Sequence, residues 1–128
     1  MARILLIEDE PVNRTLFRRV LEWGGHEILE APDGQQGIYL ALDHKPDLIL
    51  MDLSLPHMDG WTTLEHLRRK QISAPIVALT AHAMSGDRER VLAAGFNGYL
   101  SKPIDVRTFN QSLRVYLSDK AIPSQSSP

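Results

Sequence analysis

The run Leu48–Asp52 limits most strongly how this chain can fold. Four apolar residues lead directly to the carboxylate of Asp52, and the loop formers Pro56, Asp59 and Gly60 follow it. An apolar run without polar alternation is typical of a strand that is buried on both faces, as in a parallel sheet. We therefore predict a central strand that brings Asp52 to the rim of the sheet.

Three other apolar runs end at polar side chains in the same way. These side chains are Glu8 and Asp9 after the first run, Thr80 after the second and Lys102 after the third. The carboxyl ends of parallel strands share one edge, and open α/β sheets bind ligands at that edge, where the strand order reverses. We expect the three acids, the hydroxyl and the ammonium group to converge there.

Helical segments lie between the strands, and the more polar stretch His26–Ala31 is typical of an edge strand. Apolar spacing predicts helices over residues 11–23, 38–42, 61–69 and 88–94, and a last helix, capped by Asp105, that continues to 117. Strands that alternate with helices imply a parallel sheet covered on both faces by right-handed crossovers. The predicted fold is α/β, a flavodoxin-like, doubly wound (βα)5 sheet with strand order 2-1-3-4-5.

Size and composition fit one domain. The chain has 128 residues, and its hydrophobic content of 43% suffices for a core on both faces of a sheet. We expect a folded domain over residues 1–120 and a flexible tail over 121–128, which is rich in Ser and Pro. The formal net charge of -2 argues against a nucleic-acid-binding surface.

The chain contains no cysteine, which excludes disulfides and thiolate metal sites. Its apolar runs are too short to cross a bilayer, and Met1 leads directly into a strand instead of a signal peptide. We therefore expect a cytoplasmic protein with no membrane association. The initial Met1 also favours a complete gene product over a domain excised from a larger protein.

The acids at the predicted rim have a specific chemistry. Glu8, Asp9 and Asp52 repel one another at close range unless a cation neutralises them, and Mg²⁺ prefers carboxylate and phosphate oxygens. Lys102 and Thr80 offer a positive charge and a hydroxyl group to a transferring phosphoryl group, and an Asp carboxylate can itself form an acyl phosphate. The set predicts in-line phosphoryl transfer; the alternative is a rim of solvated acids without a metal.

With these motifs, the chain resembles the CheY-like receiver domains of bacterial response regulators. The resemblance covers about residues 3–118, and four stretches carry it in the family's order: Ile7–Glu10, Leu50–Gly60, Ala78–Ala81 and Ser101–Pro103. It implies a signal-transduction role in a two-component phosphorelay. Glu8 stands where the family more often has the first of two Asp residues, a difference that concerns the affinity for the metal rather than metal binding itself.

The resemblance also implies roles for individual residues. Asp52 would accept a phosphoryl group from a phosphohistidine on a histidine kinase or histidine phosphotransfer protein. Mg²⁺, or Mn²⁺, would be bound by Asp9, Asp52 and the backbone carbonyl of Ser54, with Glu8 acting largely through water. Lys102 would pair with the phosphoryl group.

Two further features follow from the same resemblance. Thr80 and Tyr99 would form a switch pair, and the Lys102-Pro103 peptide bond would be cis. The protein would be a phosphoprotein that assists its own Mg²⁺-dependent phosphorylation and dephosphorylation but is no conventional enzyme. It would act on a downstream protein target through protein–protein interactions, as a monomer or weak dimer.

The stretches Asn13-Arg14 and Thr80–Met84 are most similar to stand-alone regulators of the DivK type and to receivers of hybrid kinases. The five histidines have no metal-ligand spacing. Trp23 and Trp61 are expected to pack or to be half-buried rather than to bind a ligand.

Three alternatives have different requirements. A flavin or nucleotide binder on this fold needs a loop of Gly, Ser and Thr after the first strand, where this chain has Glu8–Pro11. A haloacid-dehalogenase-type phosphatase has a second Asp just beyond the nucleophile, where this chain has Ser54. A receiver fold that serves as an interaction module without phosphorylation is the third alternative.

Overall fold

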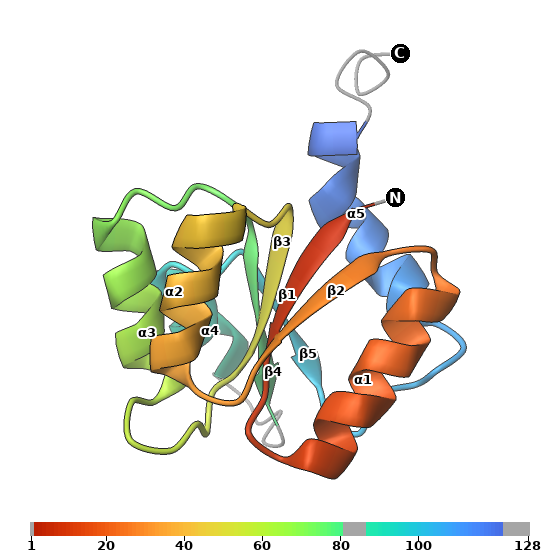
Figure 1. The fold of residues 1–128 in the computed structure, drawn as a ribbon, viewed down its shortest axis with the longest axis horizontal. Helices are drawn as coiled ribbons and strands as arrows, with labels where there is room; N and C mark the ends of the chain where they lie inside the picture. The colour runs from red at the N-terminus through yellow and green to blue at the C-terminus, as the bar shows by residue number, and fades with distance from the viewer. Residues whose placement is uncertain (1, 81–86, 122–128) are drawn as a thin grey trace.

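A five-stranded parallel sheet lies between two groups of helices in the computed structural model, which describes residues 2–80 and 87–121 (Figure 1). The elements in chain order are β1 (Arg3–Ile7), α1 (Pro11–Trp23), β2 (Glu27–Ala31), α2 (Gly34–His44), β3 (Leu48–Asp52), α3 (Gly60–Arg69), β4 (Ile76–Thr80), α4 (Asp87–Ala94), β5 (Gly98–Ser101) and α5 (Phe109–Ala121). The strand order is β2-β1-β3-β4-β5, and every pair is parallel. The predicted topology is confirmed.

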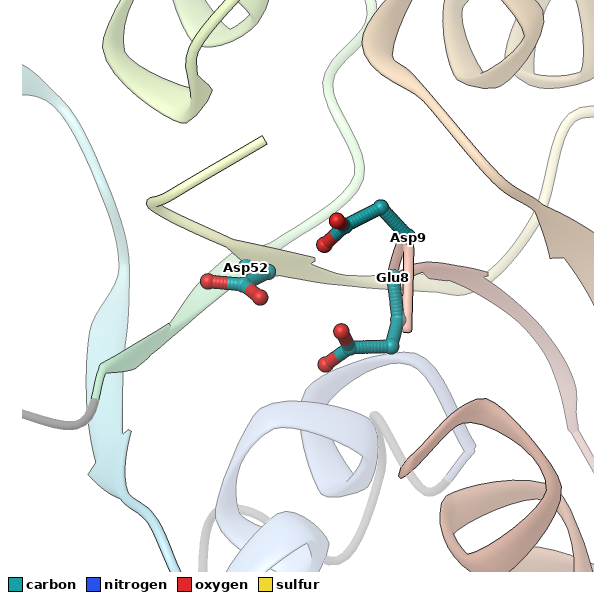
Figure 2. A group of neighbouring side chains, drawn as sticks. All are labelled: Glu8, Asp9 and Asp52. Carbon is teal, nitrogen blue, oxygen red and sulfur yellow. The ribbon is translucent and has the colours of Figure 1, made fainter. Parts of the chain in front are cut away.

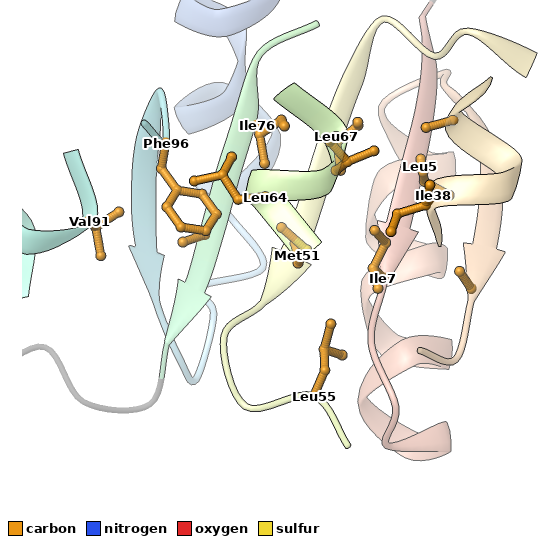
Figure 3. Packing of buried hydrophobic residues seen from close by; sticks show 14 residues of the cluster. Leu5, Ile7, Ile38, Met51, Leu55, Leu64, Leu67, Ile76, Val91 and Phe96 are labelled. Carbon is orange, nitrogen blue, oxygen red and sulfur yellow. The ribbon is translucent and has the colours of Figure 1, made fainter. Parts of the chain in front are cut away.

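The strands divide their apolar side chains between two cores. Successive residues of a strand face opposite sides of the sheet: Leu5 and Ile7 pack toward α2, α3 and α4, whereas Ile4 and Leu6 pack toward α1 and α5. Figure 3 shows the first of these cores. All residues of β3 are buried, because helices cover both faces of this central strand, as its unbroken apolar run predicted.

Helices α1, α3 and α4 end with the same pair of backbone hydrogen bonds. In α3, the amide of Ile72 donates to the carbonyl of Leu67 over 3.1 Å, and the amide of Gln71 donates to that of Arg68 over 3.0 Å. This arrangement requires a left-handed residue just after the helix, a position that glycine fills best. Gly95 has this role after α4 with φ of 116°, but Gln71 has it after α3 with φ of 64°.

We expect Gln71→Gly to stabilise the protein by about 0.5–1 kcal/mol, because relief of the left-handed strain exceeds the added freedom of the unfolded chain. Urea unfolding measures the change. The matched control is Gly95→Ala, whose new Cβ would meet Leu64 at an ordinary 3.6 Å. Strain at this φ should therefore destabilise that variant by about 1 kcal/mol. Shifts of the same sign in both variants would contradict the backbone argument.

Helix α4 is attached to the domain by few side chains. Among residues 88–94, whose side chains are described, only Val91 is buried. Next to it, Phe96 meets the ring of Trp61 edge-on at 5.7 Å between centroids. The guanidinium of Arg90 lies 5.6 Å from the centre of the same ring. Trp61 is half-buried, as predicted.

Trp23 does not pack as predicted. Its exposed fraction is 77%, because Phe17, Val20 and Leu21 form the buried face of α1 and Trp23 lies in the last turn, away from that face. A helical repeat of apolar residues locates a helix, but it does not say which member of a broad stripe faces solvent. The prediction for Trp23 was wrong.

Asp105 does not cap α5 directly. Its carboxylate accepts a hydrogen bond from the amide of Arg107 at 3.0 Å, and its carbonyl accepts from Thr108 and Phe109. These bonds form a turn that precedes the helix, so α5 begins at Phe109 rather than next to Asp105.

Some predictions concern residues 81–86 and 122–128, which lie outside the described residues. These are the Ala81–Met84 part of the subgroup motif and the tail beyond Ala121, the last residue of α5. The tail boundary at 120 stays a prediction. Within the described residues, no helix has both the length and the apolar character needed to span a membrane.

Candidate functional site

The carboxyl ends of β1 and β3 lie next to each other at the point where the strand order reverses. From β1 the chain continues to β2 on one side, and from β3 it continues to β4 on the other. Glu8 and Asp9 follow β1, and Asp52 is the last residue of β3. Figure 2 shows Glu8 and Asp9 extending toward Asp52. One oxygen from each of the three carboxylates lies within 4.8 Å of the other two.

Lys102 completes this site from the end of β5. Its Nζ lies 2.8 Å from Asp52 Oδ2 and 3.1 Å from Glu8 Oε1. The Lys102 amide donates to the carbonyl of Thr80 at 2.8 Å, which fixes its position beside the end of β4. The Lys102-Pro103 peptide bond is cis. Lys102 therefore pairs with Glu8 and Asp52, two of the three acids that the sequence placed at this rim, and Asp9 lies beside those two.

Asp52 is held on both of its carboxylate oxygens. Oδ2 accepts from Lys102, and Oδ1 accepts from the amide of Ser54 at 2.9 Å. The loop after β3 folds back tightly, since a Cβ on Gly60 would lie 2.8 Å from the carbonyl oxygen of Asp52. Glycine at position 60 is therefore a steric requirement of this loop. The Asp52 side chain is 7% exposed.

Glu8 is the most deeply buried acid of the site, with a side chain that is 1% exposed. Its Oε2 accepts a hydrogen bond from the amide of Glu10 at 3.1 Å, whereas its Oε1 accepts none and has only the ion pair with Lys102. Burial raises the pKa of the Glu8 carboxyl, and the charge of Asp52 adds to this effect. The hydrogen bond from Glu10 and the charge of Lys102 oppose it.

The pKa of Lys102 is raised. Burial by itself would lower it, but the hydrogen bond and charge of Asp52, together with the charge of Glu8, stabilise the ammonium form. Lys102 therefore stabilises the fold below its unfolded pKa of about 10.5, and this contribution is lost as the pH rises through the higher folded value.

The raised pKa of Glu8 also makes stability depend on pH, but here the folded state favours the neutral form of the side chain, whereas it favours the charged form of Lys102. As the pH rises from the ordinary value of 4.5 through the higher folded value, the folded protein binds more protons than the unfolded one, so stability falls. We expect Glu8→Gln to lack this decline in EDTA. Urea unfolding at several pH values between about 4.5 and 8 would measure it, and parallel profiles for the two proteins would contradict it.

The donor set fits a hard divalent cation. Mg²⁺ prefers carboxylate oxygens and keeps several water ligands. Asp9 is accessible to solvent, and Glu8 Oε1 is a buried oxygen without a hydrogen bond, which a cation or its water would satisfy. No other group of His, Cys, Asp and Glu side chains with such spacing occurs among the side chains that the structure describes, those of residues 2–80 and 88–117.

Comparison with known proteins identifies the family. Residues 4–114 match the response regulator receiver domain. The chain belongs to this family. It is 38% identical over 118 residues to the polar-differentiation response regulator DivK of Brucella anthropi, and the alignment covers 91% of this chain and 96% of that protein.

Solved receiver structures have the same fold. The receiver domain of the sensor histidine kinase PA1611 from Pseudomonas aeruginosa PAO1, which has a magnesium ion coordinated in its active site cleft, is 38% identical with a TM-score of 0.83. That match covers 91% of this chain and 98% of the other. The chemotaxis protein CheY4 of Vibrio cholerae is 27% identical with a TM-score of 0.85, over 91% and 99% of the two chains.

The remaining predicted residues of this receiver lie on β4 and β5. Thr80 ends β4 and is 7% exposed, and Tyr99 pairs in register with Ala78 and packs partly buried against the first core. Thr80 and Tyr99 lie on the same face of the sheet, because Thr80 is two positions after Ala78.

Two contacts of the receiver site were missed by the sequence reasoning. The Ser54 amide holds Asp52, although only the Ser54 carbonyl was assigned a role. Arg14 donates from Nη1 to the carbonyl of Glu8 at 2.9 Å, although Asn13-Arg14 entered the resemblance only as a subgroup signature. The spacing rules for helix starts, such as the capping box, do not predict a bond from an arginine of α1 to the Glu8 carbonyl.

Proposed function

We propose that Asp52 is the phosphoryl acceptor of this receiver and that the donor is a phosphohistidine on a histidine kinase or histidine phosphotransfer protein. A carboxylate oxygen of Asp52 bonds to phosphorus while the bond between phosphorus and the imidazole nitrogen breaks. The electron pair of that bond returns to the imidazole. The phosphoryl group thus moves from nitrogen to oxygen.

The neighbouring residues have separate roles in this step. Asp9, Asp52 and the backbone carbonyl of Ser54 would hold Mg²⁺ or Mn²⁺, with Glu8 acting through water, and the metal would neutralise phosphoryl oxygens when bound. Lys102 exchanges its contact with Asp52 for one with the phosphoryl group. Thr80 offers its hydroxyl to another phosphoryl oxygen.

The observation that carries the proposal is the position of Lys102 between Asp52 and Glu8. The Lys102 ammonium group, whose side chain is 17% exposed, lies 2.8 Å from one acid and 3.1 Å from another, with a third acid alongside. One positive charge neutralises only part of the negative charge of these three acids. The remaining negative charge favours binding of a cation, and the ammonium group of Lys102 can pair with a dianionic phosphoryl group. The magnesium ion in the related PA1611 receiver supports the same assignment.

Phosphorylation would change how the receiver binds a downstream protein target. Thr80 would move toward the phosphoryl group and Tyr99 would turn inward behind it, which alters the face formed by α4, β5 and α5. The sparse attachment of α4 through Val91 supports this choice of face. The protein would work in the cytoplasm, as a monomer or weak dimer.

The histidine donor would dock on α1 near Asn13 and Leu16. Val12 and Leu16 are large apolar residues of this helix with exposed fractions of 75% and 43%. They lie one turn apart in the first half of α1, the helix that begins two residues after Asp9. An interaction module that needs no phosphorylation is the competing function, and the phosphorylation experiment separates the two.

Incubation with acetyl phosphate should add one phosphoryl group when Mg²⁺ is present and none when EDTA removes it. The reason is that the acids repel an incoming phosphate unless a cation intervenes. Intact mass measures the product, and Mn²⁺ in place of Mg²⁺ tests the second metal. A chain that stays unmodified in Mg²⁺ but binds its target would favour the phosphorylation-independent module.

A further inference from the structure

The two consecutive acids Glu8 and Asp9 face Asp52 only if the main chain between them is held in one orientation. The Glu8 carbonyl belongs to the planar peptide that joins these two residues. A change in the backbone dihedral angles on either side of this peptide would move the Asp9 side chain relative to Asp52. The groups that bind the Glu8 backbone therefore decide whether the three acids can share a cation.

The Glu8 backbone is bound on both sides. Its amide donates to the carbonyl of Ala31 at the end of β2 over 3.0 Å, as a continuation of the sheet. Its carbonyl accepts from Arg14 Nη1 at 2.9 Å, a bond from a side chain of α1. The sheet therefore fixes the peptide before Glu8, and Arg14 fixes the peptide after it.

The Arg14 side chain is itself held in place. Its Nε lies 3.3 Å from Glu30 Oε1, and only 23% of the side chain is exposed. Arg18, one turn further along α1, pairs with the same carboxylate at 3.2 Å from Nε to Oε2. The two arginines thus share an ion-pair partner, but the bond to the Glu8 carbonyl comes from Arg14.

We infer that Arg14 is a positioning residue of the cation site, which keeps the Glu8–Asp9 peptide in the orientation that the shared cation needs. This inference rests on the proposed Mg²⁺ site. Groups outside the direct ligands of a metal commonly change its affinity by 10- to 100-fold, and a partly exposed hydrogen bond falls at the low end. Loss of the Arg14 head group should weaken Mg²⁺ binding by about 10-fold.

The test compares Arg14→Met with Arg18→Met. Both variants keep an unbranched apolar side chain and lose one ion pair with Glu30, but only Arg14→Met loses the bond to the Glu8 carbonyl. MgCl₂ titration followed by ¹H–¹⁵N NMR at the amides after β1 and β3 gives the affinity, and the same spectra show that each variant is folded. Urea unfolding measures stability separately.

The expected result is a Mg²⁺ affinity about 10-fold weaker in Arg14→Met and within about 2-fold of the wild type in Arg18→Met. Equal affinities in the two variants, or an unchanged affinity in Arg14→Met, would overturn the inference and leave the proposed metal site intact. A wild-type protein that binds no Mg²⁺ would overturn both. Arg14→Gln provides the same comparison should Arg14→Met fail to fold.

Discussion

Asp52→Asn should abolish phosphoryl incorporation from acetyl phosphate in Mg²⁺, with a rate at least about 1,000-fold below that of the wild type. The amide keeps the size of the side chain and can still accept from the Ser54 amide, but it lacks the anionic oxygen that bonds to phosphorus. Intact mass and the time course of incorporation measure the effect. The fold should persist, since the substitution preserves volume.

Asp59→Asn is the matched control for this substitution. Asp59 follows in the same loop and caps α3, where its Oδ1 accepts from the amide of Thr62 at 2.8 Å. Asparagine caps helices nearly as well as aspartate. We therefore expect normal incorporation in Asp59→Asn. Equal incorporation in Asp52→Asn and Asp59→Asn would assign the acceptor to another residue.

Lys102→Ala should destabilise the protein by about 3 kcal/mol at pH 7 in EDTA. The substitution leaves the Glu8 and Asp52 carboxylates, with side chains 1% and 7% exposed, without their shared cation. Removal of one partner from a buried ion pair typically costs about 3–5 kcal/mol, and the 17% exposure of Lys102 places it at the lower end. Urea unfolding measures the loss.

Two conditions should reduce this loss in a way that identifies its electrostatic origin. Mg²⁺ should restore part of the stability, because a bound cation replaces the missing charge and favours the folded state. Acid pH should also reduce the difference in stability between the variant and the wild type, because the buried Glu8 carboxyl, whose pKa is raised by burial, becomes protonated and no longer needs a cation. Lys70→Ala, a change at an exposed lysine after α3, should alter stability by less than about 0.5 kcal/mol. A loss in Lys102→Ala that neither Mg²⁺ nor acid reduces would indicate a packing defect instead.

The rim of the site could be predicted from the sequence because it depends on strand ends. Glu8, Asp52 and Lys102 each follow an apolar run, and parallel pairing brings the ends of such runs to one edge whatever the side chains do. The motifs that resemble receivers then assigned chemistry to these positions. The prediction of these rim residues therefore required no knowledge of side-chain rotamers or of interatomic distances.

The contacts within the site depend on information that the sequence pattern lacks. The bond from Arg14 to the Glu8 carbonyl depends on how α1 leans on the loop before it. The exposure of Trp23 depends on which edge of an apolar helical stripe the sheet covers. The turn at Asp105 cannot be distinguished from a helix start in the sequence, because an Asp side chain accepts a hydrogen bond from a following backbone amide in both structures.

The weak attachment of α4 has a consequence for how a partner would recognise this protein. A segment with few buried contacts opens at a free energy well below that of global unfolding. A protein that binds α4 in a new orientation would therefore have to displace Val91 from the first core and the Arg90 guanidinium from the ring of Trp61, while the second core stays intact. The energy needed to re-orient α4, the helix proposed to bind a partner, is thus largely separate from the energy that keeps the domain folded.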